Sequence, residues 1–588
     1  MTTILTKQIL PMQKHLLAVM AALILVPATL WAQEQQSLIE FHGDCYTINV
    51  DALQPDREMT LMDVLMTCSE LLSNNGKNIA LDYELYVDNI SLNISDETLL
   101  QAVKAQEISK IDIYAHTPVV VGGGGRGAII DIYFKEQDEG RTNGKLMLTG
   151  STRGNGSAYA DVVTRQGDVT VRGYAMTNLQ YARGESFDQQ HYTARQGQEN
   201  VHLNVDWNLG ERDNLKIKLN QRFQDSKVRR QDAETLLTIP ELSRYWSGVA
   251  SYTHDFNDRG ASLTAEGGAD WLKTTDENQK LQDCFAYCFT EFNVPCLNND
   301  LNILGGWEID YYNTWNVGMD RQQMMFNDVY LQLDYTRGPW MLTVGDRLRF
   351  VNYWHRDYEA YSPLWNHART ENSFMAAIGY KTGRHFIQAT LIGDYQVPTL
   401  DDIYAGYDHD HDRWMYRTEL NTHKYWSLLA RYAYQRPSLT VSTHVLHSWT
   451  RNSPSLDEQY TGAGAAVTWW KGAFRLTAGA DYYHQYVSTL DDVDNEHYNI
   501  FDLRLLPSVV LGGGLRLGAM LMYASRRSLT DPASPHLYAS VKVTKDLGRY
   551  VTLSLDCHDL AGTPRIMSYR VGESFDDRAV TLGLTWRF

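Results

Sequence analysis

The sequence predicts a mainly β protein, a transmembrane antiparallel β-barrel of about 22 strands preceded by a small N-terminal α/β domain. Three observations predict this class: an export signal, repeated segments that alternate between apolar and polar residues, and an alternating last segment that ends on an aromatic residue. No apolar run after the export signal is long enough for a membrane helix. A soluble exported protein is therefore the only rival class.

Residues 1–32 have the pattern of a secretory signal peptide. Basic residues precede the apolar run 16–26, and small residues follow it, so we expect cleavage after Ala32. The apolar run is too short to span a bilayer. Met12 is an alternative start that gives a signal of more ordinary length. These features predict export across the inner membrane.

The composition favours a barrel and excludes nucleic acid as a partner. The chain of 588 residues has 36 Tyr and 15 Trp, and its mean hydropathy is −0.39. Barrels look hydrophilic on average because lumen-facing residues alternate with lipid-facing ones, while aromatic residues form girdles at both membrane interfaces. The formal net charge is −18, which disfavours nucleic acid. Solvated loops and turns are the simplest explanation of the acidity.

The segment 580–588 alternates strictly and ends on Phe588. One face of this predicted strand carries only apolar residues, and the other carries threonine, glycine and arginine. Bacterial outer-membrane barrels commonly end in this way. We therefore interpret Trp586 and Phe588 as the insertion signal that a barrel-assembly machinery reads.

The same alternation recurs upstream. Segments 201–209, 215–219, 329–335 and 426–434 each have an apolar face and a polar face. Charged residues recur on the polar faces, which suits a wet lumen and not the dry core of a sandwich, where an unpaired charge is costly. The predicted barrel domain, 137–588, accommodates 22 strands of roughly 20 residues each, and 16 to 18 strands with longer loops also fit.

The region 44–136 differs from the barrel and is predicted to be a compact α/β domain. Thr60 and Asp63 form a capping-box pattern at the start of a helix. The glycine-rich stretch 122–127 lacks the Gly-Lys-Ser/Thr ending of a phosphate-binding loop, so we interpret it as a turn. The expected helices run toward Leu72 and from Thr98 to Gln106, and the expected strands are 81–87, 108–115 and 128–134.

The cysteines suit an oxidising compartment. Cys45 and Cys68 could join in a disulfide that staples the N-terminal domain. Cys284, Cys288 and Cys296 could hold a long loop with one thiol left over. A zinc site is the alternative for this trio, but no fourth ligand stands at a convincing spacing. Connectivity cannot be read from the sequence.

The N-terminal domain resembles the plug of TonB-dependent outer-membrane receptors, most closely the Bacteroidota branch. Segments 46–52 and 62–65 resemble the opening strand and the Asp-Val-Leu helix of that plug, and segments 83–89, 108–113 and 125–132 resemble its later motifs. In the barrel, 394–402 and 551–563 are similar to family motifs before an outer loop and before the last hairpin. The resemblance spans almost the whole mature chain.

The resemblance implies a plug inside the lumen, a location in the lipid of the Gram-negative outer membrane, and import of a scarce small-molecule ligand into the periplasm. The imported ligand would be a chelated metal, a cofactor or an oligosaccharide. A TonB-type energising complex would pull on the segment 33–43. The candidate contact residues in that segment are Ser37, Leu38, Ile39, Glu40 and Phe41.

One stretch carries metal-binding chemistry. The run Asp408, His409, Asp410, His411 and Asp412 lies in the predicted outer loop after the 394–402 motif. Alternating imidazoles and carboxylates can bind a transition metal, and the two imidazoles would share one face of an extended loop. A solvated polar loop tip is the alternative interpretation. The resemblance itself implies no bound cofactor.

Two further alternatives complete the predictions. No Gly-x-Ser-x-Gly elbow or His-Glu-x-x-His helix occurs, so we expect no enzyme. A barrel without energised transport, acting as porin, adhesin or partner subunit, is the stronger rival. Asn89 and Ala128 stand where the family pattern has glycine, and the candidate contact segment matches the family weakly.

Overall fold

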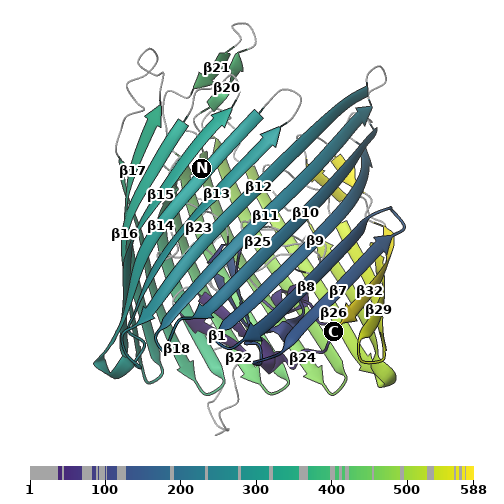
Figure 1. Ribbon diagram of the computed structural model, residues 1–588, viewed down its shortest axis with the longest axis horizontal. Coiled ribbons are helices and arrows are strands. Elements are labelled where there is room, and N and C mark those ends of the chain that lie inside the picture. Colours follow the sequence, from purple (N-terminus) through teal and green to yellow (C-terminus); the bar gives the residue numbers. More distant parts are fainter. Residues whose placement is uncertain are drawn as a thin grey trace, which may run out of the picture.

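The computed structural model describes a barrel and a smaller sheet domain (Figure 1). In the described part of the chain, no helix is long and apolar enough to cross a membrane. The described residues are 38–42, 45–68, 83–87, 90–91, 100, 102–114, 128–185, 191–231, 236–275, 280–316, 322–355, 369–396, 404–408, 413–416, 423–452, 456–489, 496–525, 536–561, 565–568, 573–575 and 578–588.

The barrel is a closed antiparallel ring of 22 strands among the described residues, as the sequence predicted. Neighbours in the ring are neighbours in the chain, except that β19 pairs with β22 and β29 pairs directly with β32. The short strands β30 (Arg565–Ser568) and β31 (Glu573–Phe575) form a hairpin that pairs with β9.

The ring strands have the following bounds: β7 (Thr142–Ser151), β8 (Gly156–Gln166), β9 (Val169–Glu185), β10 (His191–Asn208), β11 (Asp213–Gln231), β12 (Leu236–Asp255), β13 (Ser262–Thr275), β14 (Lys280–Cys296), β15 (Leu301–Asn316), β16 (Gln322–Arg337), β17 (Trp340–His355), β18 (Arg369–Thr382), β19 (His385–Gln396), β22 (His423–Arg436), β23 (Leu439–Asn452), β24 (Leu456–Lys471), β25 (Phe474–Thr489), β26 (Glu496–Leu511), β27 (Leu515–Ala524), β28 (His536–Leu547), β29 (Val551–His558) and β32 (Ala579–Arg587).

The outer face of the ring is apolar. On β32, Leu582 is 65% exposed and Trp586 47%, and Phe588, the residue after this strand, is 50% exposed. Similar leucine, valine and tryptophan side chains project outward all around the ring. A water-soluble protein would not expose so large a continuous apolar surface. A bilayer accepts it, so the ring is a membrane barrel of the outer-membrane type.

The inner face is polar and holds charges in pairs. Asp328 on β16 is fully buried and receives Arg349 Nη2 and Arg347 Nη1, both at 2.6 Å, from β17. Arg347 also contacts Glu308 on β15 at 2.7 Å. Paired charges on the lumen side explain the charged residues on the polar faces of the sequence pattern.

The strands are longer than the membrane requires. A membrane strand needs about 9–11 residues, whereas β12 has 20 residues and β11 has 19. The excess projects beyond the apolar band, where the outward residues become polar, as at Glu199 and Asp225. The alternating segments in the sequence therefore marked only the membrane-facing part of each strand.

The first and last strands close the ring. Phe588 and Gly144 exchange two backbone hydrogen bonds of 3.0 Å. A Cβ atom at Gly144 would lie 2.4 Å from the Phe588 ring and 2.9 Å from the carbonyl oxygen of Asp161. Glycine is therefore required where the terminal aromatic ring packs across the seam.

The smaller domain is built around a six-stranded sheet in the order β1-β2-β5-β6-β3-β4, in which only β3 and β6 pair in parallel. Its strands are β1 (Ile39–His42), β2 (Cys45–Asn49), β3 (Tyr83–Val87), β4 (Ile90–Ser91), β5 (Ile108–Tyr114) and β6 (Ala128–Phe134). Its helices are η1 (Val50–Leu53), α2 (Leu61–Leu65) and η2 (Ala105–Glu107). We call this domain the plug.

The plug confirms some local predictions and corrects others. The Thr60–Asp63 capping box forms, but α2 ends at Leu65 instead of continuing toward Leu72. The expected second helix falls partly outside the described residues, and its last part is the 3-10 turn η2. The sheet begins at β1, so it includes residues that the sequence assigned to the separate segment 33–43.

The structure does not form the loop that the sequence suggested for the three neighbouring cysteines. No disulfide joins any of the six cysteines, all of which lie in the described part of the chain. Cys284, Cys288 and Cys296 lie on one strand, β14, instead of in a loop. At about 3.3 Å per residue the first two are roughly 13 Å apart, well beyond the reach of a disulfide. Cys45 and Cys68 are both buried in the plug and are not joined in a disulfide.

Candidate functional site

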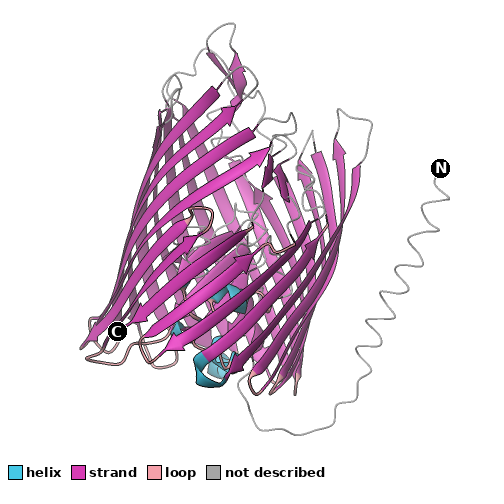
Figure 2. Cartoon of the chain, turned by 90° about the vertical axis from the view of Figure 1, so that its right-hand side faces the viewer, coloured by secondary structure: helices cyan, strands magenta, loops and turns pink. Residues whose placement is uncertain are grey.

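The plug lies inside the barrel, and the interface between the two is the candidate functional site. Plug residues contact ring strands that are spread around most of the ring: β7, β11, β18, β19, β22, β25, β26, β27 and β32. Only a body within the ring can reach strands distributed around it. Figure 2 shows the plug helices within the ring at one end of the barrel.

The plug end of the barrel is the end with short turns. Tight connections such as 338–339 and 383–384 lie there, and the hairpin β20–β21 projects beyond the opposite rim (Figure 1). Barrels of the outer-membrane type place short turns in the periplasm and longer loops outside the cell. The plug therefore blocks the periplasmic half of the lumen.

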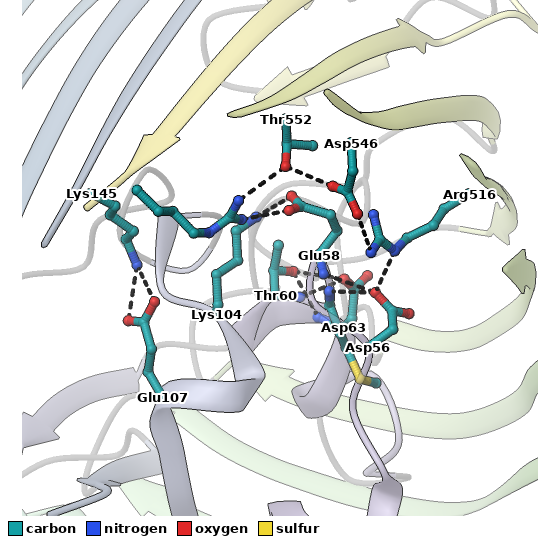
Figure 3. A network of polar contacts seen from close by, with 12 residues as sticks. Asp56, Glu58, Thr60, Asp63, Lys104, Glu107, Lys145, Arg516, Asp546 and Thr552 are labelled. Carbon is teal, nitrogen blue, oxygen red and sulfur yellow. Dashed lines mark hydrogen bonds and ion pairs between the residues drawn. The ribbon is translucent and has the colours of Figure 1, made fainter. Parts of the chain in front are cut away.

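Glu58 is the centre of a buried ionic contact between plug and barrel (Figure 3). It is only 8% exposed, and it lies 3.3 Å from Lys104 Nζ of the plug and 2.5 Å from Arg587 Nη2 of β32. Burial opposes its ionisation, but the two cations outweigh burial and lower the pKa of Glu58. The plug therefore presents a carboxylate to the last barrel strand.

Lys104 is the most strongly perturbed group of this contact. Burial lowers the pKa of Lys104 to about 8, although the Glu58 carboxylate acts in the opposite direction. Other barrel cations, among them Lys145 and Arg587, add to the lowering. The contact thus places several cations close to one carboxylate in a buried site.

The contact continues along the barrel wall and returns to the plug. Arg587 donates to Thr552 Oγ1 at 3.0 Å, and Thr552 donates to Asp546 at 2.8 Å. Asp546 pairs with Arg516 at 2.9 Å. Arg516 Nε lies 3.5 Å from Asp56 of the plug. Ion pairs and charge-assisted hydrogen bonds therefore link the plug to four neighbouring strands, β27, β28, β29 and β32.

Local structure of the plug orients the two carboxylates of this contact. Asp56 accepts hydrogen bonds from the backbone N–H groups of Glu58 at 2.8 Å and Met59 at 3.2 Å. The Thr60–Asp63 capping box follows at once and fixes the start of α2. The turn and the cap together direct Asp56 and Glu58 toward the barrel wall (Figure 3).

A second ion pair joins the plug to the first barrel strand. Lys145 Nζ donates to both carboxylate oxygens of Glu107, at 2.6 and 2.9 Å. Lys145 is only 4% exposed, and it also lies 3.5 Å from Asp161 of β8 and 5.3 Å from the ring centroid of Tyr159. The strands on both sides of the barrel seam therefore hold the plug.

The candidate TonB-contacting residues are packed between the plug and the barrel. Ser37 lies outside the described residues, whereas Leu38, Ile39 and Phe41 are almost fully buried. Glu40 lies 3.4 Å from Lys381 Nζ on β18. The Phe41 ring packs edge to face, at 4.8 Å, against a phenylalanine ring of β19. In this arrangement the segment is covered.

A single barrel side chain binds the backbone of this segment. The Gln435 side-chain oxygen on β22 accepts hydrogen bonds from the N–H groups of Leu38 at 2.7 Å and Ile39 at 3.3 Å, and its amide nitrogen donates to the Ile39 carbonyl. Gln435 thus occupies the free edge of β1 as a neighbouring strand would. It satisfies backbone groups that an edge strand otherwise exposes.

The predicted metal-binding run is only partly described. β20 (Tyr404–Asp408) pairs with β21 (Arg413–Tyr416), and Asp408 is the register partner of Arg413. His409, Asp410, His411 and Asp412 lie outside the described residues, at the connection of these two strands. In the described part of the chain, no group of three or more His, Cys, Asp or Glu side chains is placed to hold a metal. The metal site therefore stays a prediction.

Sequence reasoning missed the barrel side of the interface. Gln435, Arg516 and Arg587 are polar residues on alternating strands, and the sequence contains many such residues. The available signal was their position near the short-turn ends of strands, where the resemblance placed the plug. Only the closed ring brings residues as distant as Glu58 and Arg587 into contact.

Comparisons with known proteins give a likeness in structure only. No protein-family model and no curated protein sequence matches the chain. The copper transporter OprC matches with a TM-score of 0.73 at 10% identity, over 95% of this chain and 100% of that one. The ferric-catecholate import receptor Fiu from E. coli K12, in its closed form, matches with a TM-score of 0.67 at 12% identity, over 96% and 100%.

A third match comes from another species. The siderophore receptor PiuA from Acinetobacter baumannii has a TM-score of 0.67 at 11% identity and covers 95% of this chain and 99% of its own. The chain has the TonB-dependent receptor fold. The predicted fold is confirmed, while the Bacteroidota branch stays a prediction. The named neighbours are transporters and receptors, in agreement with the expectation that the chain is not an enzyme.

Proposed function

We propose that this protein is an energised outer-membrane receptor that imports a scarce ligand into the periplasm. The observation that carries the proposal is the plug, which lies inside a complete ring and is held there by polar and charged contacts beside apolar packing. When a plug moves, hydrogen bonds to water replace such contacts, so the net free-energy cost of the movement is modest.

Energised import requires a segment of the plug that an energising partner can bind and pull. Ligand binding alone shifts an equilibrium only by the difference in affinity between two states, so it cannot drive uptake against a gradient. The segment 33–43 contains β1, and β1 is the edge strand of the plug sheet. A TonB-type complex that pulls on this segment would first separate β1 from the Gln435 side chain.

The ligand we favour is a transition metal or its chelate. The neighbours OprC and Fiu are named for copper transport and ferric-catecholate import. In this chain, β20 and β21 form a hairpin beyond the rim opposite the plug, and the predicted His and Asp ligands 409–412 come between these two strands in the sequence. Imidazole nitrogen is a preferred ligand of copper and zinc. A cofactor or an oligosaccharide is the alternative cargo.

The remaining parts of the proposal follow from this assignment. The signal 1–32 would be removed on export, and the segments 33–43, 44–136 and 137–588 would serve as energy contact, plug and barrel. The partners would be the lipid of the outer membrane, the barrel-assembly machinery and a TonB-type complex.

Growth on limiting nutrients tests the proposal. We expect cells that lack the protein to grow poorly on one of limiting copper, iron, cobalamin or glycans. Deleting residues 33–37, which leaves β1 intact, should reproduce that defect while the barrel still inserts. His409→Gln with His411→Gln should reproduce it only for a metal. Normal growth of the deletion strain would refute energised import.

A non-energised barrel is the second candidate, and one observation favours it. Leu38, Ile39 and Phe41 are buried, so the presumed energy contact is covered in this structure. A passive porin would conduct ions steadily in a planar bilayer. A plugged receptor should stay closed there until urea releases the plug. An open wild-type barrel without urea would establish the passive function.

A further inference from the structure

Two histidines face each other on the outer surface of the barrel, outside the plug interface. His484 follows Tyr482 on the lipid side of β25, and His497 is on the same side of β26. In the strand register His484 is opposite Asn499 and His497 is opposite Tyr486, so the two histidines are diagonal neighbours. Long side chains on diagonal positions of adjacent strands reach each other.

The pair lies between the apolar band and the rim opposite the plug. Toward the short turns, the outward side chains Leu503, Leu505 and Leu476 are apolar. Tyr482 and Phe501 follow as aromatic residues at the edge of that band. On the side of the long connections, His484 comes next on β25, and Asn499 and then His497 come next on β26. The two histidines therefore lie beyond the aromatic edge of the apolar band, where His497 is exposed and His484 is half-buried.

The spacing of the two nitrogens suits a metal ion. His484 Nε2 and His497 Nδ1 are 3.4 Å apart. Metal–nitrogen bonds of about 2.0–2.1 Å at a tetrahedral angle place two ligand nitrogens roughly 3.3–3.4 Å apart. The ring centroids are 5.4 Å apart and the ring planes are inclined by 22°, so both side chains must rotate to direct their lone pairs at one ion. A hydrogen bond of this length between two neutral imidazoles would be long and weak.

A second layer of contacts fixes the tautomer of His484. Its Nδ1 lies 3.1 Å from Asn499 Oδ1, and Tyr482 donates its hydroxyl to that same oxygen at 2.8 Å. Because the Asn499 oxygen can only accept, Nδ1 of His484 carries the proton and Nε2 keeps its lone pair. Metal-binding histidines almost always donate their other N–H in this way. The Tyr486 ring lies 4.9 Å from His497 and limits its rotation.

His447 is a nearby surface histidine that faces no second imidazole in the described part of the chain. His447 on β23 is also exposed on the outer face, but its Nδ1 lies 2.8 Å from Thr461 Oγ1. Thr461 in turn is the register partner of His484. His447 therefore shares the environment of the pair without facing a second imidazole. It is the matched control.

We propose that His484 and His497 bind a divalent transition-metal ion, of the class of Cu²⁺, Zn²⁺ or Ni²⁺, on the outside of the barrel. Imidazole suits these ions and not Mg²⁺ or Ca²⁺, which prefer oxygen ligands. Water or an outer ligand completes the coordination. The site is independent of the proposed transport function, because it lies outside the lumen.

Copper titration of the purified protein tests the site. The parent is the full chain in detergent, without a polyhistidine tag, carrying His409→Gln and His411→Gln so that the outer loop contributes no imidazole. Electron paramagnetic resonance with Cu²⁺ alone should show one bound ion coupled to two imidazole nitrogens. His484→Gln or His497→Gln should weaken binding at least tenfold, and His447→Gln should leave it unchanged.

The supporting contact gives a second, separate measurement. Asn499→Leu keeps both imidazoles but frees the tautomer of His484, so Cu²⁺ affinity should fall about tenfold. Equal Cu²⁺ binding by the parent and both single-histidine variants would overturn the proposal. Binding that requires His447 would overturn it too. A failure of this test leaves the growth experiment for import unaffected, and the converse also holds.

Discussion

Replacing Glu58 by glutamine should loosen the plug without disturbing the barrel. The side chain keeps its size but loses its charge, so Lys104 and Arg587 stay buried, or nearly so, beside an uncharged group. Removing one partner of a buried ion pair costs about 3–5 kcal/mol, because the remaining charge is uncompensated. At the lower figure, the population of opened plug rises more than a hundredfold.

Hydrogen exchange measures this change directly. The amides of β2 and β5, two interior strands of the plug sheet, exchange when the plug opens. We expect Glu58→Gln to accelerate their exchange more than a hundredfold in detergent-solubilised protein. Amides in the barrel ring, for example in β11 and β12, should exchange at unchanged rates. The barrel amides thus report any general loss of structure.

An exposed ion pair of equal length is the control. Arg141 and Asp138 are also 2.5 Å apart, but their side chains are 68% and 69% exposed. An exposed pair contributes only about 0–1 kcal/mol, so Asp138→Asn should change plug exchange fivefold at most. If Glu58→Gln changes the exchange of β2 and β5 no more than Asp138→Asn does, burial of the contact is not what holds the plug.

Three further predictions concern the same fold. Between pH 8 and 10.5 the folded plug has released the Lys104 proton while the unfolded chain still holds it, so the free energy of plug unfolding should rise by up to about 3 kcal/mol. Lys104→Met should abolish the rise of the urea midpoint with pH. An identical dependence of the midpoint on pH in both proteins would refute this prediction. Gln435→Leu should expose β1, because it removes the side chain that binds the backbone of this strand. A thiol introduced by Glu40→Cys should then react with a maleimide at least tenfold faster than the same thiol in a protein that keeps Gln435. Equal rates would show that Gln435 does not hold the strand. Gly144→Val should prevent ring closure because its Cβ would overlap the Phe588 ring, seen as loss of the compact heat-modifiable band on a gel; normal insertion would show that the seam can shift.

Much of the fold followed from local patterns in the sequence. Alternation over 580–588 and 201–209 predicted which side chains face lipid, because in a strand the period of two is a local property of the backbone. The Thr60–Asp63 capping box likewise acts within one turn of chain and forms as predicted. The strand number required the structure, since counting residues fitted either fewer long-looped strands or more short-looped ones.

The cysteines show the limit of such patterns. Cys284, Cys288 and Cys296 are close in sequence, and closeness suggested a loop held by a disulfide. In a strand the same separation becomes a distance of many ångströms, and the three thiols spread along β14. A pattern of residue types predicts chemistry only once the backbone conformation between them is known.

The sequence by itself determined that this chain forms a membrane barrel with a separate N-terminal domain, because amphipathic alternation and capping are short-range effects. Only the tertiary structure decided which residues hold the plug, why the segment from Leu38 to Phe41 is covered, and that His484 meets His497. These contacts join residues that can be hundreds of positions apart, such as Glu58 and Arg587. Ring closure and strand register bring them together, and neither is written in any one stretch of the chain.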